Sequence, residues 1–282
     1  MSRPKTNLLA SLALLLGSCG GGGEGGGNGG GAPVVPPTQS PPSPTGVYAV
    51  PAAEALMWAE VQQIVAQAVA EASARGLPAT VAVVDRVGNV LAVFAMNGAN
   101  QQLRVPRGPN GSTHDLQGID VPGAVAGAIA KAVTGAYLSS GGNAFSTRTA
   151  SMIVQEHFPP SQATAGLESG PLFGVQFSQL PCSDLAARFN GNVGAGGLIG
   201  PKRSPLGLAA DAGGLPLYKN GVVVGGVGVM ADGVYGFDPE IQDVDQDGEE
   251  YIALAATTSF AAPEEIRAER ISVDGTLLRF AD

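Results

Sequence analysis

Apolar residues beyond residue 50 follow first a helical and then a strand-like pattern. From Ala52 to Arg75 they recur at helical spacing, and Gly76 follows as a stop signal. Runs rich in β-formers cover residues 80–84 and 90–94 on either side of a short polar segment. This order predicts one helix followed by a β-hairpin.

Two further hairpins are predicted in the second half of the chain. Asn220-Gly221 separates apolar runs within residues 215–229, and this dipeptide favours a type I′ turn. Asp274-Gly275 lies near the centre of residues 271–280 and gives a similar signal. The three hairpins are separated by predicted helices.

The remaining segments are helices and two long loops. Helices are predicted at residues 123–138, 147–157, 249–259 and 263–269, whereas residues 97–122 and 158–213 are rich in Gly, Pro or polar residues. Strands joined by short turns and separated by helices favour an antiparallel sheet packed with helices. We therefore expect an α+β fold over residues 46–282, with long inserts near residues 98–122 and 158–213.

The first residues resemble a bacterial export signal. Arg3 and Lys5 precede the apolar run 8–16, which is too short to span about 30 Å of hydrocarbon as a helix. The sequence Leu-Gly-Ser-Cys that ends at Cys19 resembles the lipobox of lipoproteins, which are cleaved before the cysteine and lipidated on it. We expect residues 1–18 to be a signal peptide. Gly20 lacks the acid that marks inner-membrane retention, so the outer membrane or cell surface is favoured.

A tether of low complexity follows the cysteine. Residues 20–31 contain ten Gly and residues 33–44 contain six Pro, so residues 19–45 are expected to form a spacer without a fold. Cleavage after Ser18 would leave a net charge of −11. An acidic domain of this kind would attach to the membrane only through the lipid. The sequence also has no cluster of Lys and Arg, so binding of nucleic acid is not expected.

Four segments together resemble the GlcG/HbpS family of haem-binding proteins. They are the first hairpin at residues 80–89, the Lys-Ala-Val-Thr sequence at 131–134, the second hairpin at 213–229, and Asp247 with the helix after it. The resemblance implies a profilin-like α/β sandwich, homo-oligomeric assembly and, in several members, binding of haem or a related tetrapyrrole. The family's usual Arg and acid after the first hairpin are absent here.

A ligand site is expected beside the helix 123–138. Lys131 interrupts a run of small residues, and its ammonium requires water, an internal partner or an anionic ligand such as a haem propionate. A solvated helix face is the alternative for this lysine. Thr134 lies three residues further along and can face the same side. Asn97-Gly98 and Gly213-Gly214 are expected to form the opposite wall.

Only two histidines could supply imidazole to a haem iron, and His157 is the better candidate. The alternative for His157 is a capping or core role, and His114 lies in a polar loop. Asp243, Asp245 and Asp247 imitate half of a calcium loop, but Leu254 occupies the position that requires Glu. Calcium is therefore not expected, and Asp247 is predicted to cap the next helix.

These observations favour an exported, lipid-anchored haem-binding protein for capture, storage or sensing, without catalysis. Two alternatives remain open at this stage. One is an enzyme or enzyme subunit that acts on a small organic acid held by Lys131, and the other is an oligomeric interaction module of the cell envelope. No Gly-x-Ser-x-Gly motif is present to indicate a serine nucleophile.

Overall fold

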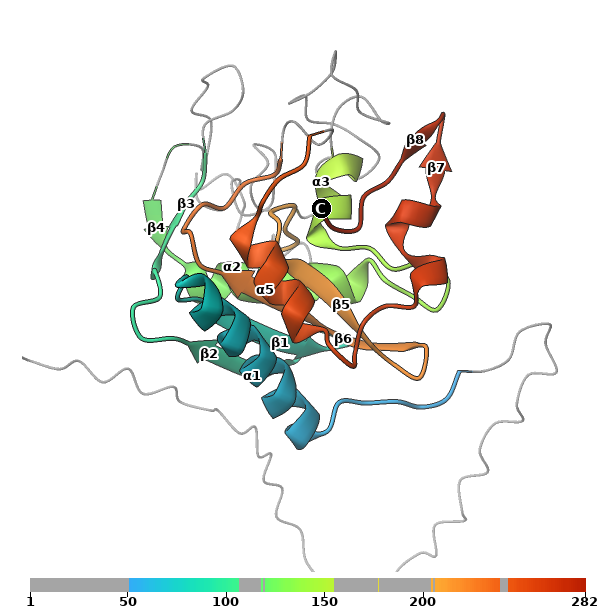
Figure 1. Ribbon diagram of the computed structural model, residues 1–282, viewed down its shortest axis with the longest axis horizontal. Coiled ribbons are helices and arrows are strands. Elements are labelled where there is room, and N and C mark those ends of the chain that lie inside the picture. The colour runs from blue at the N-terminus through green and yellow to red at the C-terminus, as the bar shows by residue number, and fades with distance from the viewer. Residues whose placement is uncertain are drawn as a thin grey trace, which may run out of the picture. The chain divides into compact units, whose positions relative to one another are not determined.

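A four-stranded antiparallel sheet forms the centre of the fold (Figure 1). The computed structural model describes residues 51–106, 118, 120–154, 177, 204, 206–238 and 243–282. The strands are β1 (Thr80–Asp85), β2 (Val90–Ala95), β5 (Gly214–Lys219) and β6 (Val222–Met230), in the order β2-β1-β6-β5. The expected α+β class is confirmed.

The first and second hairpins share this sheet because β1 pairs with β6. Thr80 lies opposite Met230 at one end of this ladder, and Asp85 lies opposite Gly225 at the other. In the turn between β5 and β6, Asn220 and Gly221 have φ values of 51° and 77°. Both residues are left-handed, as a type I′ turn requires, so the predicted turn is confirmed.

Helices cover both faces of the sheet. They are α1 (Trp58–Arg75), α2 (Ala124–Tyr137), α3 (Thr147–Ile153) and α5 (Gly248–Ala256). Val81 and Val83 of β1 share a core with α1 and α5, whereas Ala82 and Val84 share a second core with α2. The alternation of side chains along one strand thus supplies two cores, one on each side of the sheet.

Helix α2 packs unusually close to β6 because glycines face it. A methyl group at Gly226 would collide with the carbonyl oxygen of Ala132, and one at Gly228 would collide with that of Ala128. The small residues predicted along this helix therefore meet small residues on the strand. The contact is made largely by backbone atoms and leaves no space for a ligand between these two elements.

The helix boundaries differ in part from the sequence prediction. Helix α1 begins at Trp58 instead of Ala52, since Met57 is the N-cap and its N–H donates to the Glu60 carboxylate over 2.7 Å. Its end is as predicted, with Gly76 at a φ of 64°. Residues 155–157 of the third predicted helix lie outside the described residues.

One predicted loop contains strands, and one predicted helix is replaced by shorter turns. The loop 97–122 contains β3 (Gln102–Arg104) and β4 (Asp120–Pro122), which pair with each other. The helix expected at 263–269 is instead a pair of 3-10 turns, η1 (Glu264–Ile266) and η2 (Ala268–Arg270). The third hairpin is confirmed as β7 (Ser272–Val273) and β8 (Thr276–Leu277).

The expected signal peptide, Cys19 and the tether lie outside the described residues, as does most of the 158–213 insert. Residues 51–282 form one compact unit. In the part of the chain that the structure describes, we find no helix that is both long and apolar enough to cross a bilayer.

Candidate functional site

Lys131 lies in the interior, with no exposed side-chain surface. Its Nζ is 2.5 Å from Asp211 Oδ2 and also donates a hydrogen bond to Glu249. Asp211 precedes β5, and Glu249 belongs to the first turn of α5. The partners that this ammonium requires are therefore supplied by the chain itself. This finding corrects both expectations for Lys131, a solvated helix face and a propionate contact.

The cluster of Lys131, Asp211 and Glu249 holds two carboxyl groups beside one cation. Burial raises the pKa of Asp211 to about 7, against the opposing charge of Lys131. Burial also raises the pKa of Glu249 well above its usual range. Burial alone would lower the pKa of Lys131, but the two carboxylates outweigh it and the net shift is upward. The two carboxylates thus stabilise the charged form of the lysine, while burial disfavours the charged forms of both acids.

Backbone amides also donate hydrogen bonds to these acids. Glu249 Oε1 accepts from the N–H groups of Ala231 and Asp232, the latter over 3.0 Å. Asp211 Oδ1 accepts from the N–H of Gly236 over 3.0 Å. The cluster therefore ties α2, α5 and the segment after β6 together, which is a structural role.

Thr134 and the Gly213-Gly214 pair also have partners inside the protein. The Thr134 hydroxyl donates to Ala130 O and accepts from Ala209 N, both over 2.7 Å. A methyl at Gly214 would collide with the backbone oxygen of Lys131, and one at Gly213 would lie 2.9 Å from Glu249 Cβ. The structure thus brings Gly213 and Gly214 to the Lys131 cluster, but their tight contacts leave no room for a ligand between them and the cluster.

Asn97 and Gly98 do not join this group. Both are exposed beyond the end of β2. A methyl at Gly98 would approach only Pro78, at 3.7 Å. They therefore do not form the opposite wall that was expected. His157 and His114, the candidate iron ligands, lie outside the described residues, as does Cys19.

A second buried cation, Arg148 of α3, was not identified from the sequence. Its side chain is 1% exposed, and its Nε and Nη2 each donate to Glu250 over 3.3 Å. Its Nη1 donates to Asp238 over 3.1 Å and to Asp245 over 2.6 Å. The sequence does contain a signal that could have identified Arg148, and it is the same as for Lys131: a single cation among the small and uncharged residues of a helix.

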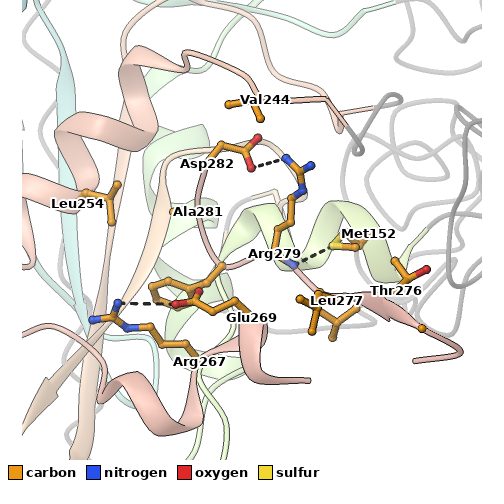
Figure 2. Close-up of a pocket in the computed structure, with 13 residues that line it drawn as sticks. Met152, Val244, Leu254, Arg267, Glu269, Thr276, Leu277, Arg279, Ala281 and Asp282 are labelled. Atoms are coloured by element: carbon orange, nitrogen blue, oxygen red, sulfur yellow. Dashed lines mark hydrogen bonds and ion pairs between the residues drawn. The ribbon is translucent and has the colours of Figure 1, made fainter. Parts of the chain in front are cut away.

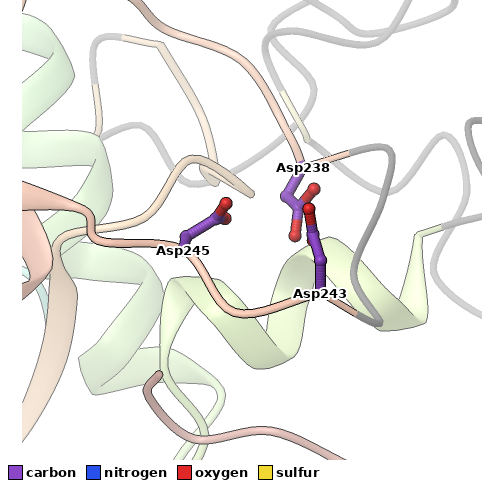
Figure 3. A group of neighbouring side chains, drawn as sticks. All are labelled: Asp238, Asp243 and Asp245. Carbon is purple, nitrogen blue, oxygen red and sulfur yellow. The ribbon is translucent and has the colours of Figure 1, made fainter.

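Figure 3 shows three acidic side chains that come together. Carboxylate oxygens of Asp238, Asp243 and Asp245 lie within 4.8 Å of one another. Arg148 already supplies a positive charge to two of them. Asp247 does not join them, because its carboxylate accepts from Glu250 N over 2.9 Å and caps α5, as predicted.

A cavity of about 730 Å³ lies between α3, α5 and the C-terminal segment (Figure 2). Its walls combine apolar side chains with two arginines and two acids. The lining includes Val244, Leu254, Arg267, Glu269, Leu277, Arg279, Phe280 and Asp282. Ligand pockets for small molecules have volumes of roughly 300–1,000 Å³. Among the described residues, this cavity has the size and the mixed lining of a binding site.

Comparison with solved structures gives several distant similarities. The Klebsiella pneumoniae protein ORFY is 18% identical, with 76% of this chain and 97% of that chain covered and a TM-score of 0.42. A PduOC:heme complex is 17% identical, with coverage of 73% and 96% and a TM-score of 0.40. A double mutant of Streptomyces reticuli HbpS is 18% identical, with coverage of 77% and 97% and a TM-score of 0.37.

A comparison with curated protein sequences gives no match. A family model described as "Haem degrading protein HbpS-like" matches residues 56–103. This stretch contains α1, the whole β1–β2 hairpin and most of β3. The resemblance inferred from the sequence is therefore confirmed in this segment, which is similar to the HbpS-like haem-degrading family.

Proposed function

We propose that this protein is an exported, lipid-anchored haem-binding protein that captures, stores or senses haem without transforming it. The observation that carries the proposal is the match of residues 56–103 to the HbpS-like family model. The matched residues form a complete helix and hairpin, with β1 paired to β6 in the central sheet. The similarity therefore falls on elements that define the fold.

The anchoring part of the proposal rests on the sequence. The short apolar run before Cys19 and the Gly/Pro-rich residues 20–45 fit a lipoprotein whose domain is held away from the outer membrane or cell surface. We assign the iron ligand to His157, since imidazole is a common axial ligand of haem. We also expect a homo-oligomer, which light scattering of the purified protein would test.

The proposal is tested by titrating hemin into the full-length chain that carries Cys19→Ala, in which no lipid can be attached. A Soret band that saturates at a fixed stoichiometry is expected. A spectrum identical to that of hemin in buffer would overturn the proposal. A buffer blank gives the spectrum of free hemin against which the signal is measured.

Haem degradation is the second candidate, because the family model that matches residues 56–103 is described in those words. The same sample, supplied with ascorbate and oxygen, distinguishes the two functions. A Soret band that persists supports a carrier or sensor. A band that decays faster than that of hemin with albumin, and that releases iron to a chelator, would replace the non-catalytic role by degradation.

A further inference from the structure

Large apolar side chains line the cavity in Figure 2 at several separate places. Val244 is 74% exposed and Leu277 of β8 is 59% exposed, and Leu254 of α5 lies apart from both. Large apolar side chains at the mouth of a cavity lose contact with water when an apolar ligand covers them. The cavity therefore favours a ligand with a sizeable apolar surface.

Arg267 provides a cation at the same cavity. Its Nε donates to Ala262 O over 3.0 Å, and its guanidinium carbon lies 5.5 Å from the centre of the Phe280 ring. These two contacts fix the orientation of the side chain. Its nearest carboxylate, Glu269, is 3.9 Å from Nη1, and the described part of the chain gives Nη2 no partner. The outer edge of this guanidinium can therefore receive a carboxylate in the two-pronged geometry that arginine favours.

Arg279, on another side of the cavity, is already engaged. Its Nη1 lies 2.6 Å from Asp282 Oδ1 and also donates to the backbone oxygen of Asp243. Its backbone N–H donates to Met152 Sδ over 3.1 Å. An anionic ligand would have to displace these contacts in order to bind Arg279. Recognition of a carboxylate in this cavity therefore falls to Arg267.

We propose that this cavity is the haem site of the protein. The apolar part of the porphyrin lies against Val244, Leu254 and Leu277, and one propionate binds Arg267. This inference rests on the proposed function for the identity of the ligand. It moves the anionic contact from Lys131, whose charge is matched internally, to Arg267, whose Nη2 has no partner among the described residues.

The test compares hemin binding by two cavity variants with binding by two matched controls. Arg267→Gln removes the charge and should weaken hemin binding roughly tenfold to a hundredfold. Arg270→Gln is its control, because Arg270 does not line the cavity and pairs with Glu264 at the surface. Leu277→Ser should weaken binding roughly tenfold. Val87→Ser, at a 55% exposed position in the β1–β2 turn, is the second control.

Metal-free protoporphyrin IX, followed by its fluorescence, separates the cavity from the iron ligand. The four variants should rank in the same order with this probe as with hemin, since the propionates and the apolar ring are unchanged. Urea unfolding of each variant establishes that a weaker binder is still folded, and Arg267→Lys should recover part of the affinity.

The outcomes separate this inference from the proposed function. If the parent protein binds hemin and the cavity variants bind it equally well, the location is wrong and the haem-binding function stands. If the parent protein binds no hemin, both fail together. Loss of affinity in the two cavity variants, with both controls unchanged, supports the site.

Discussion

Arg148 and Glu250 lie side by side in the protein interior, with Nε–Oε1 and Nη2–Oε2 distances of 3.3 Å. This paired contact joins α3 to the first turn of α5. The preceding residue, Glu249, binds Lys131 of α2. Two consecutive acids of one helix thus neutralise buried cations from two other helices.

Removal of Arg148 should destabilise the fold strongly. Arg148→Met leaves Glu250, Asp238 and Asp245 without their shared cation, and loss of one partner of a buried ion pair costs roughly 3–5 kcal/mol. Urea unfolding of the full chain measures this loss in unfolding free energy. Arg270→Met, whose pair with Glu264 is exposed, should change it by less than about 1 kcal/mol. Equal losses of unfolding free energy in the two variants would show that the buried ion pairs of Arg148 stabilise the fold no more than an exposed pair does.

The buried Asp211 predicts an unusual pH dependence of stability. Burial raises its pKa from 3.8 to about 7 on folding, so the folded chain binds more protons than the unfolded chain between these values. The contribution of this group to the unfolding free energy therefore decreases as the pH rises from about 4 to about 7.

Asp211→Asn should flatten that slope, because the amide does not titrate. Urea unfolding at several pH values measures the slope for both proteins, and Asp274→Asn in an exposed turn is the control for the substitution itself. Part of the slope should persist in the variant, since the pKa of Glu249 is also raised by burial. A slope that is unchanged in Asp211→Asn would contradict the assignment.

Gly221 tests the conformation of the second hairpin in isolation from packing. An added methyl at this position meets nothing within 4 Å, but the φ of 77° is left-handed. Gly221→Ala should therefore lower the unfolding free energy by about 1–2 kcal/mol through backbone strain alone. Gly141 has equally open surroundings without a positive φ, so Gly141→Ala should cost nothing or stabilise slightly.

The anchor is tested by substitution of Cys19. Cys19→Ala should move the protein from the membrane fraction to the soluble fraction, because the tether and the acidic domain offer no other attachment. Fractionation of the host cells, followed by immunoblotting, measures the distribution. Cys182 is the other cysteine of the sequence, and Cys182→Ala serves as a control that should leave the protein in the membranes. Retention of the Cys19 variant there would exclude the lipoprotein assignment.

The assignment of His157 to the iron predicts a spectral effect. His157→Ala should shift the Soret maximum of the hemin complex, because a different axial ligand changes the electronic environment of the iron. Absorbance spectroscopy measures the shift, with His114→Ala as the matched control. A spectrum that is the same in all three proteins would require another iron ligand.

The hairpins could be predicted from the sequence because their signals are local. Asn220-Gly221 and Asp274-Gly275 each specify a left-handed turn within two residues, and the apolar runs on either side indicate the paired strands. The predicted start of α1 was wrong because the helical pattern of apolar residues continues upstream of Met57. The helix in fact begins after Met57, whose backbone N–H donates to the Glu60 carboxylate. Strands β3 and β4 were missed because three residues are too few to show alternation.

The candidate site was predictable only in part. A lone lysine among small residues shows that a buried charge needs a partner, but it does not show which residue provides it. Asp211 and Glu249 are 80 and 118 positions away from Lys131, and only the fold brings them together. The cavity beside Arg267 has no local signature at all, because its walls come from α3, α5 and the last strands.

The close contact between α2 and β6 has a consequence for motion. Gly226 and Gly228 place the strand's backbone directly against that of the helix, so at these two positions no side chain can rearrange between the two elements. We therefore expect α2 and β6 to separate only when the domain unfolds.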